Sequence, residues 1–151
     1  MIPAEDDLLD TSNFNTEHRE MIKPTPPARI LVADDDHAVA QAIARVLTQA
    51  DYHVEVVHAG DEALGRLRTD TFALVILDVS MPGLDGRDVL SHLSRNETPF
   101  ETPILVITGR YDEYVQETVL GLGARDVLEK PFDVLGLVSR VRALIDEGQP
   151  N

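Results

Sequence analysis

The stretch LVADDDHAV, residues 31–39, carries an apolar, strand-like run directly into three adjacent carboxylates, Asp34, Asp35 and Asp36. Like charges this close repel one another by about 4 kcal/mol per pair at a separation of about 4 Å near a protein surface. A folded chain therefore needs a compensating positive charge at this place. Which cation can reach it depends on the fold that surrounds the stretch.

From Arg29 onward, short apolar runs alternate with amphipathic stretches, which is the pattern of βα units. Strands are expected at residues 29–33, 53–57, 72–77, 103–107 and 126–129. Helical spacing of apolar residues and the turn signals between the strands predict helices at 39–50, 60–68, 85–95, 111–122 and 134–145. Two of the strands are almost wholly apolar, as parallel strands covered on both faces are. The pattern predicts an α/β fold with a doubly wound, five-stranded parallel sheet flanked by five helices.

The bulk composition fits one soluble domain. The chain has 151 residues, of which 43% are hydrophobic, and no apolar stretch approaches the roughly 18 residues of a membrane span. The acidic N-terminus lacks the features of a secretory signal, and the absence of cysteine excludes disulfides, thiol catalysis and zinc fingers. A net charge of −14 disfavours direct nucleic-acid binding, because such binders collect Lys and Arg. We expect a cytoplasmic protein without membrane insertion.

The sequence divides into three segments. Residues 1–27 are acidic, lack sustained periodicity and end in KPTPPAR, so we interpret them as a flexible tail. A docking segment around Phe14 or Met21-Ile22 is the alternative interpretation. Residues 28–147 are expected to form the α/β domain, and residues 148–151 a short C-terminal tail. We expect a single-domain protein, although the same residues fit an excised part of a longer one.

The polar residues at the predicted strand ends indicate a site. In a parallel sheet all carboxyl ends open on one edge, and ligands bind there at the point where strand order reverses. The residues at or just beyond these ends are Asp34, Asp35, Asp78, Thr108 and Lys130. Three acids, one hydroxyl and one ammonium would therefore share one pocket.

The three consecutive acids need separate explanations. Helix capping accounts for Asp36, because an acid before a helix satisfies free backbone amides. It does not account for Asp34 and Asp35, so with Asp78 nearby either carboxyl pKa values rise or a cation binds. Hard oxygen ligands favour Mg²⁺. We interpret His37 as a solvent-facing helix residue, because no second histidine stands at metal-binding spacing.

Lys130 is one of two lysines in the chain, whereas eleven arginines supply the other bases. A departure from arginine indicates a need for a compact ammonium that approaches a single phosphoryl or carboxylate oxygen. Thr108 is weaker evidence, because threonine is common in strands. The loop VSMPGLDG after Asp78 predicts a tight turn before the next helix.

Four segments together resemble the response-regulator receiver domain over about residues 28–147. They are ILVADDD, LVILDVSMPGLDG, PILVITG and GARDVLEKPF. The resemblance implies the flavodoxin-like receiver fold, with Asp78 as the phosphoacceptor. It also implies a Mg²⁺ site made of Asp34, Asp35, Asp78 and the backbone carbonyl of Ser80, with Asp35 a direct ligand.

The resemblance further implies that Thr108 bonds the transferred phosphoryl group, that Lys130 pairs with it, and that the Lys130-Pro131 bond is cis. The implied function is that of a phosphoacceptor in a two-component phosphorelay, which catalyses only its own phosphorylation and dephosphorylation. The implied donor is a phosphohistidine on a sensor histidine kinase or a phosphotransfer protein, and the output is binding of an unidentified protein. Such chemistry requires mainly positioning and charge neutralisation from the protein.

The chain departs from the family pattern at Val127, where many members carry a switching aromatic residue on the last strand. We hypothesise that Tyr111 or Tyr114 reports the phosphorylation state instead. In the family, the positions of Ser80 and Arg110 affect the lifetime of the phosphoryl group.

Two other functions compete with a receiver. A haloacid-dehalogenase-like phosphatase also uses an aspartate nucleophile with Mg²⁺, but it needs a second aspartate two residues further on, where this chain has Ser80. A non-phosphorylated, receiver-like docking scaffold is the other alternative, and the intact set of acids, threonine and lysine argues against it. A nucleotide-binding loop of the GxxxxGK[ST] type is absent, and GLGARD, residues 121–126, fits a helix C-cap better.

Overall fold

The computed structural model describes residues 26–95, 100–109 and 113–148. The strands in these ranges are β1 (Arg29–Ala33), β2 (His53–Val57), β3 (Leu74–Asp78), β4 (Ile104–Thr108) and β5 (Asp126–Glu129). The helices are α3 (His37–Gln49), α4 (Gly60–Thr69), α5 (Gly86–Ser94), α6 (Glu113–Gly121) and α7 (Val134–Glu147). The interpretations of Phe14, Met21-Ile22, Arg110, Tyr111 and nearly all of both predicted tails lie outside the described residues.

The strands form one parallel sheet in the order β2-β1-β3-β4-β5. The predicted doubly wound sheet with five flanking helices is thereby confirmed. The strand order reverses between β1 and β3, and this is the point where such sheets open a crevice at their carboxyl edge. Among the described helices, none is long and apolar enough to cross a bilayer.

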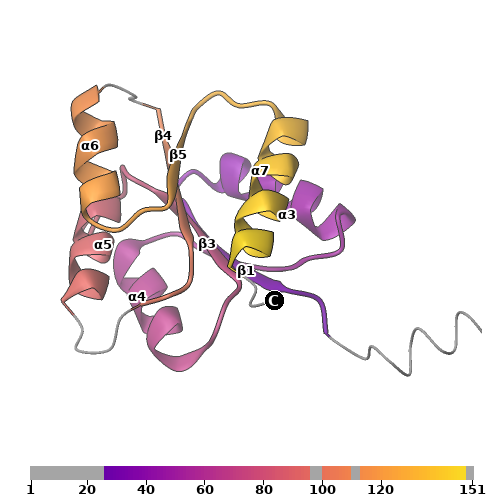
Figure 1. Ribbon diagram of the computed structural model, residues 1–151, viewed down its shortest axis with the longest axis horizontal. Coiled ribbons are helices and arrows are strands. Elements are labelled where there is room, and N and C mark those ends of the chain that lie inside the picture. Colours follow the sequence, from indigo (N-terminus) through magenta and orange to yellow (C-terminus); the bar gives the residue numbers. More distant parts are fainter. Residues whose placement is uncertain (1–25, 96–99, 110–112, 149–151) are drawn as a thin grey trace, which may run out of the picture.

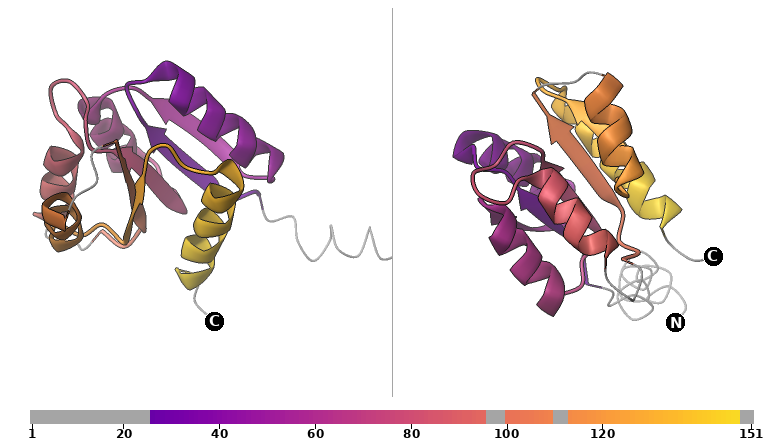
Figure 2. Two further views of the ribbon diagram at one scale, coloured as in Figure 1. Left: turned by 90° about the horizontal axis from the view of Figure 1, so that it is seen from above. Right: turned by 90° about the vertical axis from the view of Figure 1, so that its left-hand side faces the viewer.

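Two helix layers cover the sheet, with α3 and α7 on one face and α4, α5 and α6 on the other (Figures 1 and 2). Alternation along the strands explains why both faces are buried, because successive side chains point to opposite faces. In β1, Ile30 and Val32 pack toward α3 and α7, whereas Leu31 and Ala33 pack toward the other layer. All five residues of β3 and all five of β4 are buried, as the apolar runs predicted.

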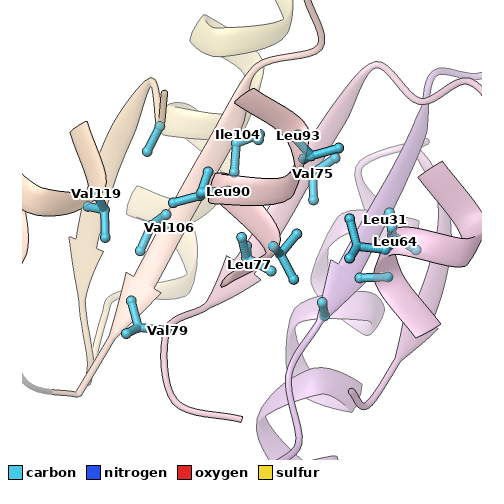
Figure 3. Close-up of a cluster of buried hydrophobic side chains, with 14 of the residues drawn as sticks. Leu31, Leu64, Val75, Leu77, Val79, Leu90, Leu93, Ile104, Val106 and Val119 are labelled. Carbon is cyan, nitrogen blue, oxygen red and sulfur yellow. The ribbon is translucent and has the colours of Figure 1, made fainter. Parts of the chain in front are cut away.

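Leucine and valine side chains fill the larger of the two interfaces (Figure 3). Leu64 of α4 and Leu90 of α5 belong to one buried cluster with strand residues such as Leu77, and each of the three is at most 4% exposed. Burying a side chain of this size contributes about 1.5–3 kcal/mol to the free energy of folding. The packed helix layers therefore stabilise the sheet and the position of its carboxyl edge.

The predicted bounds of two strands were wrong by one or two residues. We expected β3 at 72–77 and β4 at 103–107, but hydrogen bonding runs over Leu74–Asp78 and Ile104–Thr108. The apolar pattern reports burial, and Phe72 is buried at 4% exposure without belonging to the ladder. Asp78 and Thr108 are consequently the last residues of their strands rather than the first residues beyond them.

Local signals fix the helix ends. Asp36 is the N-cap of α3, and its carboxylate accepts hydrogen bonds from the amides of Ala38 and Val39, as expected. Asp85 forms a reciprocal capping box with Asp88 at the start of α5. Past the end of α6, Gly123 has a φ of 114°, in agreement with the helix C-cap predicted from GLGARD.

Two glycines of α4 allow the same substitution to be compared in two surroundings. A Cβ on Gly60 would lie 2.1 Å from the backbone oxygen of Leu84, whereas a Cβ on Gly65 meets nothing within 4 Å. We expect Gly60→Ala to lower the free energy of unfolding by about 1–3 kcal/mol through overpacking, and Gly65→Ala to raise it by up to about 1 kcal/mol through helix propensity. Urea unfolding measures both changes, and shifts of the same sign would contradict the close approach.

Candidate functional site

Strand register brings the polar residues to one edge of the sheet. Ala33 pairs with Leu77, so Asp34 emerges beside Asp78. Asp78 pairs with Ile107, one residue before Thr108, and Thr108 pairs with Glu129, one residue before Lys130. The backbone amide of Lys130 donates to the Thr108 carbonyl at 2.8 Å, which extends the ladder by one further bond.

An ammonium lies between two buried carboxylates. Asp34 is fully buried and Asp78 is 3% exposed. Nζ of Lys130 lies 3.0 Å from Oδ2 of Asp34 and 3.5 Å from Oδ1 of Asp78. One positive charge thus contacts two acids, and the peptide bond that follows Lys130, to Pro131, is cis as expected.

Burial and the neighbouring charges shift the pKa values of Asp78 and Lys130 for different reasons. Burial raises the pKa of Asp78 to about 7, and the neighbouring Asp34 carboxylate adds to the rise, while Lys130 opposes it. Burial also disfavours the charged form of Lys130, but the carboxylates of Asp34 and Asp78 outweigh this effect and raise the pKa of the ammonium. Without a further cation, Asp78 is therefore protonated more readily than an ordinary aspartate.

Three carboxylates are arranged as ligands for a cation. Asp34, Asp35 and Asp78 each offer an oxygen, and these oxygens lie within 4.8 Å of one another. Within the described residues, Oδ2 of Asp34 is buried and receives no hydrogen bond of good geometry, although the Lys130 ammonium lies 3.0 Å away, so this oxygen keeps capacity to accept a further partner. An all-oxygen set with an exposed member, Asp35, fits a hard, partly hydrated divalent ion.

The structure also places the remaining predicted residues. Thr108 is 2% exposed at the end of β4. Ser80 lies in the loop after β3, where its backbone amide donates to Oδ1 of Asp78 at 3.4 Å. Whether the Ser80 carbonyl turns to a metal stays a prediction. Gly86 holds this loop close, because a Cβ there would lie 2.5 Å from the carbonyl oxygen of Asp78.

A pair of stacked histidines was missed by the sequence analysis. His37 is solvent-exposed, as expected, but its ring stacks on that of His58 with centroids 3.7 Å apart and planes inclined by 9°. Nδ1 of His58 also lies 2.9 Å from the carbonyl oxygen of Asp34. Spacing along the chain could not reveal the pair, because it forms between the residue that follows β2 and the first residue of α3.

The family model described as the response regulator receiver domain matches residues 30–142. The chain belongs to this family. Response regulator MprA of Mycolicibacterium vanbaalenii is 44% identical over 127 residues, which cover 83% of this chain and 53% of the relative. Response regulator MprA of Mycobacterium avium is 44% identical over 124 residues, covering 81% and 53%. The chain thus spans about half the length of these curated relatives.

Solved structures agree with this assignment. The receiver domain of the Francisella response regulator 1452 superposes with a TM-score of 0.76 at 30% identity, covering 81% of this chain and 99% of that domain. The chemotaxis response regulator CheY4 of Vibrio cholerae gives 0.73 at 28% identity, covering 78% and 98%. The described residues therefore form a receiver domain of two-component signalling, a family whose members generally bind Mg²⁺.

The raised pKa of Asp78 predicts a specific pH dependence. Its pKa of about 7 exceeds the ordinary value of 3.8, so between these values the folded receiver binds more protons than the unfolded chain. The stability of the metal-free protein should therefore fall as pH rises through this window. Relative to Asp78→Asn, the wild type should lose about 2–3 kcal/mol between pH 5 and 8, at about 1.4 kcal/mol per pH unit.

Urea unfolding in the presence of a chelator measures this difference. The contribution of the histidines to the pH dependence is common to both proteins and drops out of the comparison. If the free energy of unfolding changed with pH in the same way for both proteins, the pKa of Asp78 would not be raised in the folded state.

Proposed function

We propose that this receiver domain accepts a phosphoryl group on Asp78 from a phosphohistidine and then presents an altered surface to a protein partner. The observation that supports the proposal most directly is the contact of one ammonium with two buried carboxylates, beside a third, at the sheet edge. Asp78 is the last residue of a fully buried strand, at the edge where the strand order of the sheet reverses. A sensor histidine kinase or a phosphotransfer protein is the proposed donor.

In the proposed reaction, a carboxylate oxygen of Asp78 attacks phosphorus in line with the departing imidazole nitrogen of the donor. The new O–P bond forms as the N–P bond breaks, and the donor imidazole leaves with the electron pair. Lys130 would pair with an oxygen of the transferred group, and the Thr108 hydroxyl would donate to another. Asp34, Asp35, Asp78 and the Ser80 carbonyl would hold Mg²⁺, which would neutralise charge on the transferred group.

The proposal separates this chain from a turnover enzyme. Each donor would modify Asp78 once, and the domain would catalyse only its own phosphorylation and dephosphorylation. Ser80 occupies the position where an aspartate-nucleophile phosphatase needs its second acid. We propose that the output is contact with a protein rather than with nucleic acid, because the chain carries a net charge of −14.

The switching route is part of the proposal. Val127, 8% exposed, packs in the buried cluster that includes Val119 of α6, at the position where many members of the family carry an aromatic residue. Tyr114 on α6 is 70% exposed, and we propose that its spectroscopic signal reports a change in its surroundings. Phosphorylation would add a charge of about −1.5 to −2 at Asp78. Through its contact with Thr108, this charge would shift the conformational equilibrium of the segment between β4 and α6.

Acetyl phosphate with Mg²⁺ tests the phosphoacceptor. We expect the wild type to gain one phosphoryl group as an acid-stable, base-labile adduct, and Asp78→Asn to gain none. Asp70→Asn, a change of the same kind on the α4 surface, is the control and should label like the wild type. Intact-protein mass spectrometry followed by peptide mapping reads the result. Continuous release of phosphate would indicate a phosphatase, and no adduct would indicate the docking scaffold.

The shape of the cation at position 130 gives a second prediction. A guanidinium fork cannot occupy the place of an ammonium that lies 3.0 Å from Asp34 and 3.5 Å from Asp78 without displacing one of them. We expect Lys130→Arg to slow labelling by acetyl phosphate by about tenfold or more, although the charge is kept. Lys23→Arg, at the other lysine of the chain, should have no effect. Equal rates for Lys130→Arg and the wild type would show that charge alone matters.

A further inference from the structure

The ring of His58 occupies the place of a backbone hydrogen bond between β1 and β2. In a parallel pair, a residue donates to one neighbour of its partner and accepts from the other. The Asp34 amide donates to the Val57 carbonyl at 3.1 Å, so its own carbonyl would accept next from the amide of Ala59. Among the described hydrogen bonds, that carbonyl instead meets Nδ1 of His58 at 2.9 Å. Since a carbonyl only accepts, Nδ1 carries the proton.

In this register the backbone amide of His58 points away from β1. Its amide donates to Oε1 of Glu62, in the first turn of α4, at 3.1 Å. Backbone pairing between β1 and β2 ends at Ala33 and Val57, and the side chain of His58 adds one further hydrogen bond between the two segments. The imidazole ties the tip of β2 to the residue that leads into the acidic loop, residues 34–36.

A second contact holds the ring in this orientation. His37, the first residue of α3, stacks on it with centroids 3.7 Å apart. Between the two contacts, the amide of Asp36 donates to Oδ1 of Asp34 at 2.9 Å. The ring of His58 thus contacts the first residue of the acidic loop, through the hydrogen bond at Asp34, and the residue directly after the loop, through the stacked ring of His37.

The peptide group that follows Asp34 transmits this constraint. The Asp34 carbonyl and the Asp35 amide belong to one plane, because the peptide bond resists rotation. A donor that fixes the carbonyl also fixes the direction in which Asp35 leaves the sheet. Asp35 is exposed, so the orientation of its backbone is not set by burial.

We propose that His58 is a positioning residue for the acidic loop, and that its Nδ1 hydrogen bond to Asp34 holds the peptide plane in the orientation that lets Asp34 and Asp35 bind a cation together. The role in cation binding rests on the proposed function. The orientation of the loop does not, and it can be measured without any metal.

Two substitutions separate the hydrogen bond from the ring. The amide nitrogen of asparagine occupies the place of Nδ1, so His58→Asn keeps a donor and loses the stack. His58→Phe keeps a ring to stack on His37 and loses the donor. His53→Phe, at the start of the same strand with a side chain 56% exposed, is the matched control.

The first readout is the amide resonance of Asp35 in the metal-free, full-length protein, together with the free energy of unfolding. We expect the Asp35 resonance to move in His58→Phe and to stay near the wild-type position in His58→Asn and His53→Phe. An unmoved resonance in His58→Phe would overturn the positioning role, whatever its stability.

The second readout is the dissociation constant for Mg²⁺, measured by calorimetry. His58→Phe should weaken binding by about tenfold, the lower end for a partner of a metal ligand because water reaches this half-buried ring. His58→Asn should recover most of that loss. Equal weakening in both variants would assign the effect to the ring and overturn the proposal.

The two failures are distinguishable. A wild type that binds no Mg²⁺ would refute the proposed function and the cation-binding role of His58, whereas the Asp35 resonance would still decide the orientation of the loop.

Discussion

Repulsion between carboxylates at the tips of neighbouring parallel strands is the constraint on which the site depends. Asp34 and Asp78 are both buried, and the ammonium of Lys130 contacts each of them. With the exposed Asp35 beside them, one positive charge faces three potential negative ones. A proton on Asp78 reduces the remaining negative charge, whereas a divalent ion bound to the three carboxylates balances it, so the proton and the ion compete for Asp78.

The fold keeps this arrangement together against its own repulsion. Parallel register delivers Asp34, Asp78 and Thr108 to one edge, and two apolar layers prevent the strands from sliding apart. Close backbone contacts hold the loops, because Gly86 lies against the carbonyl of Asp78. His58 adds a bond where the ladder between β1 and β2 would otherwise end. The cost of assembling like charges is thus met by packing elsewhere, which is common at functional sites.

Much of this could be predicted from the sequence, because apolar periodicity and strand-end polarity both follow from burial. The order of elements, the parallel sheet and the convergence of Asp34, Asp78 and Lys130 were predicted correctly. The bounds of β3 and β4 were not; at the start of β3 the reason is that Phe72 is buried without belonging to the hydrogen-bonded ladder. The stacking of His37 on His58 depends on side-chain contact between segments far apart in the chain, for which the sequence contains no periodic signal.

Titration calorimetry of Mg²⁺ binding at pH 7, in two buffers of different ionisation enthalpy, tests the charge balance most directly. The number of protons released equals the number that the cation displaces from the site. With the pKa of Asp78 at about 7, the account predicts release of about half a proton per ion bound, and none in Asp78→Asn. Binding of Mg²⁺ to the wild type without proton release would show that the carboxylates are already charge-balanced, and would contradict the account.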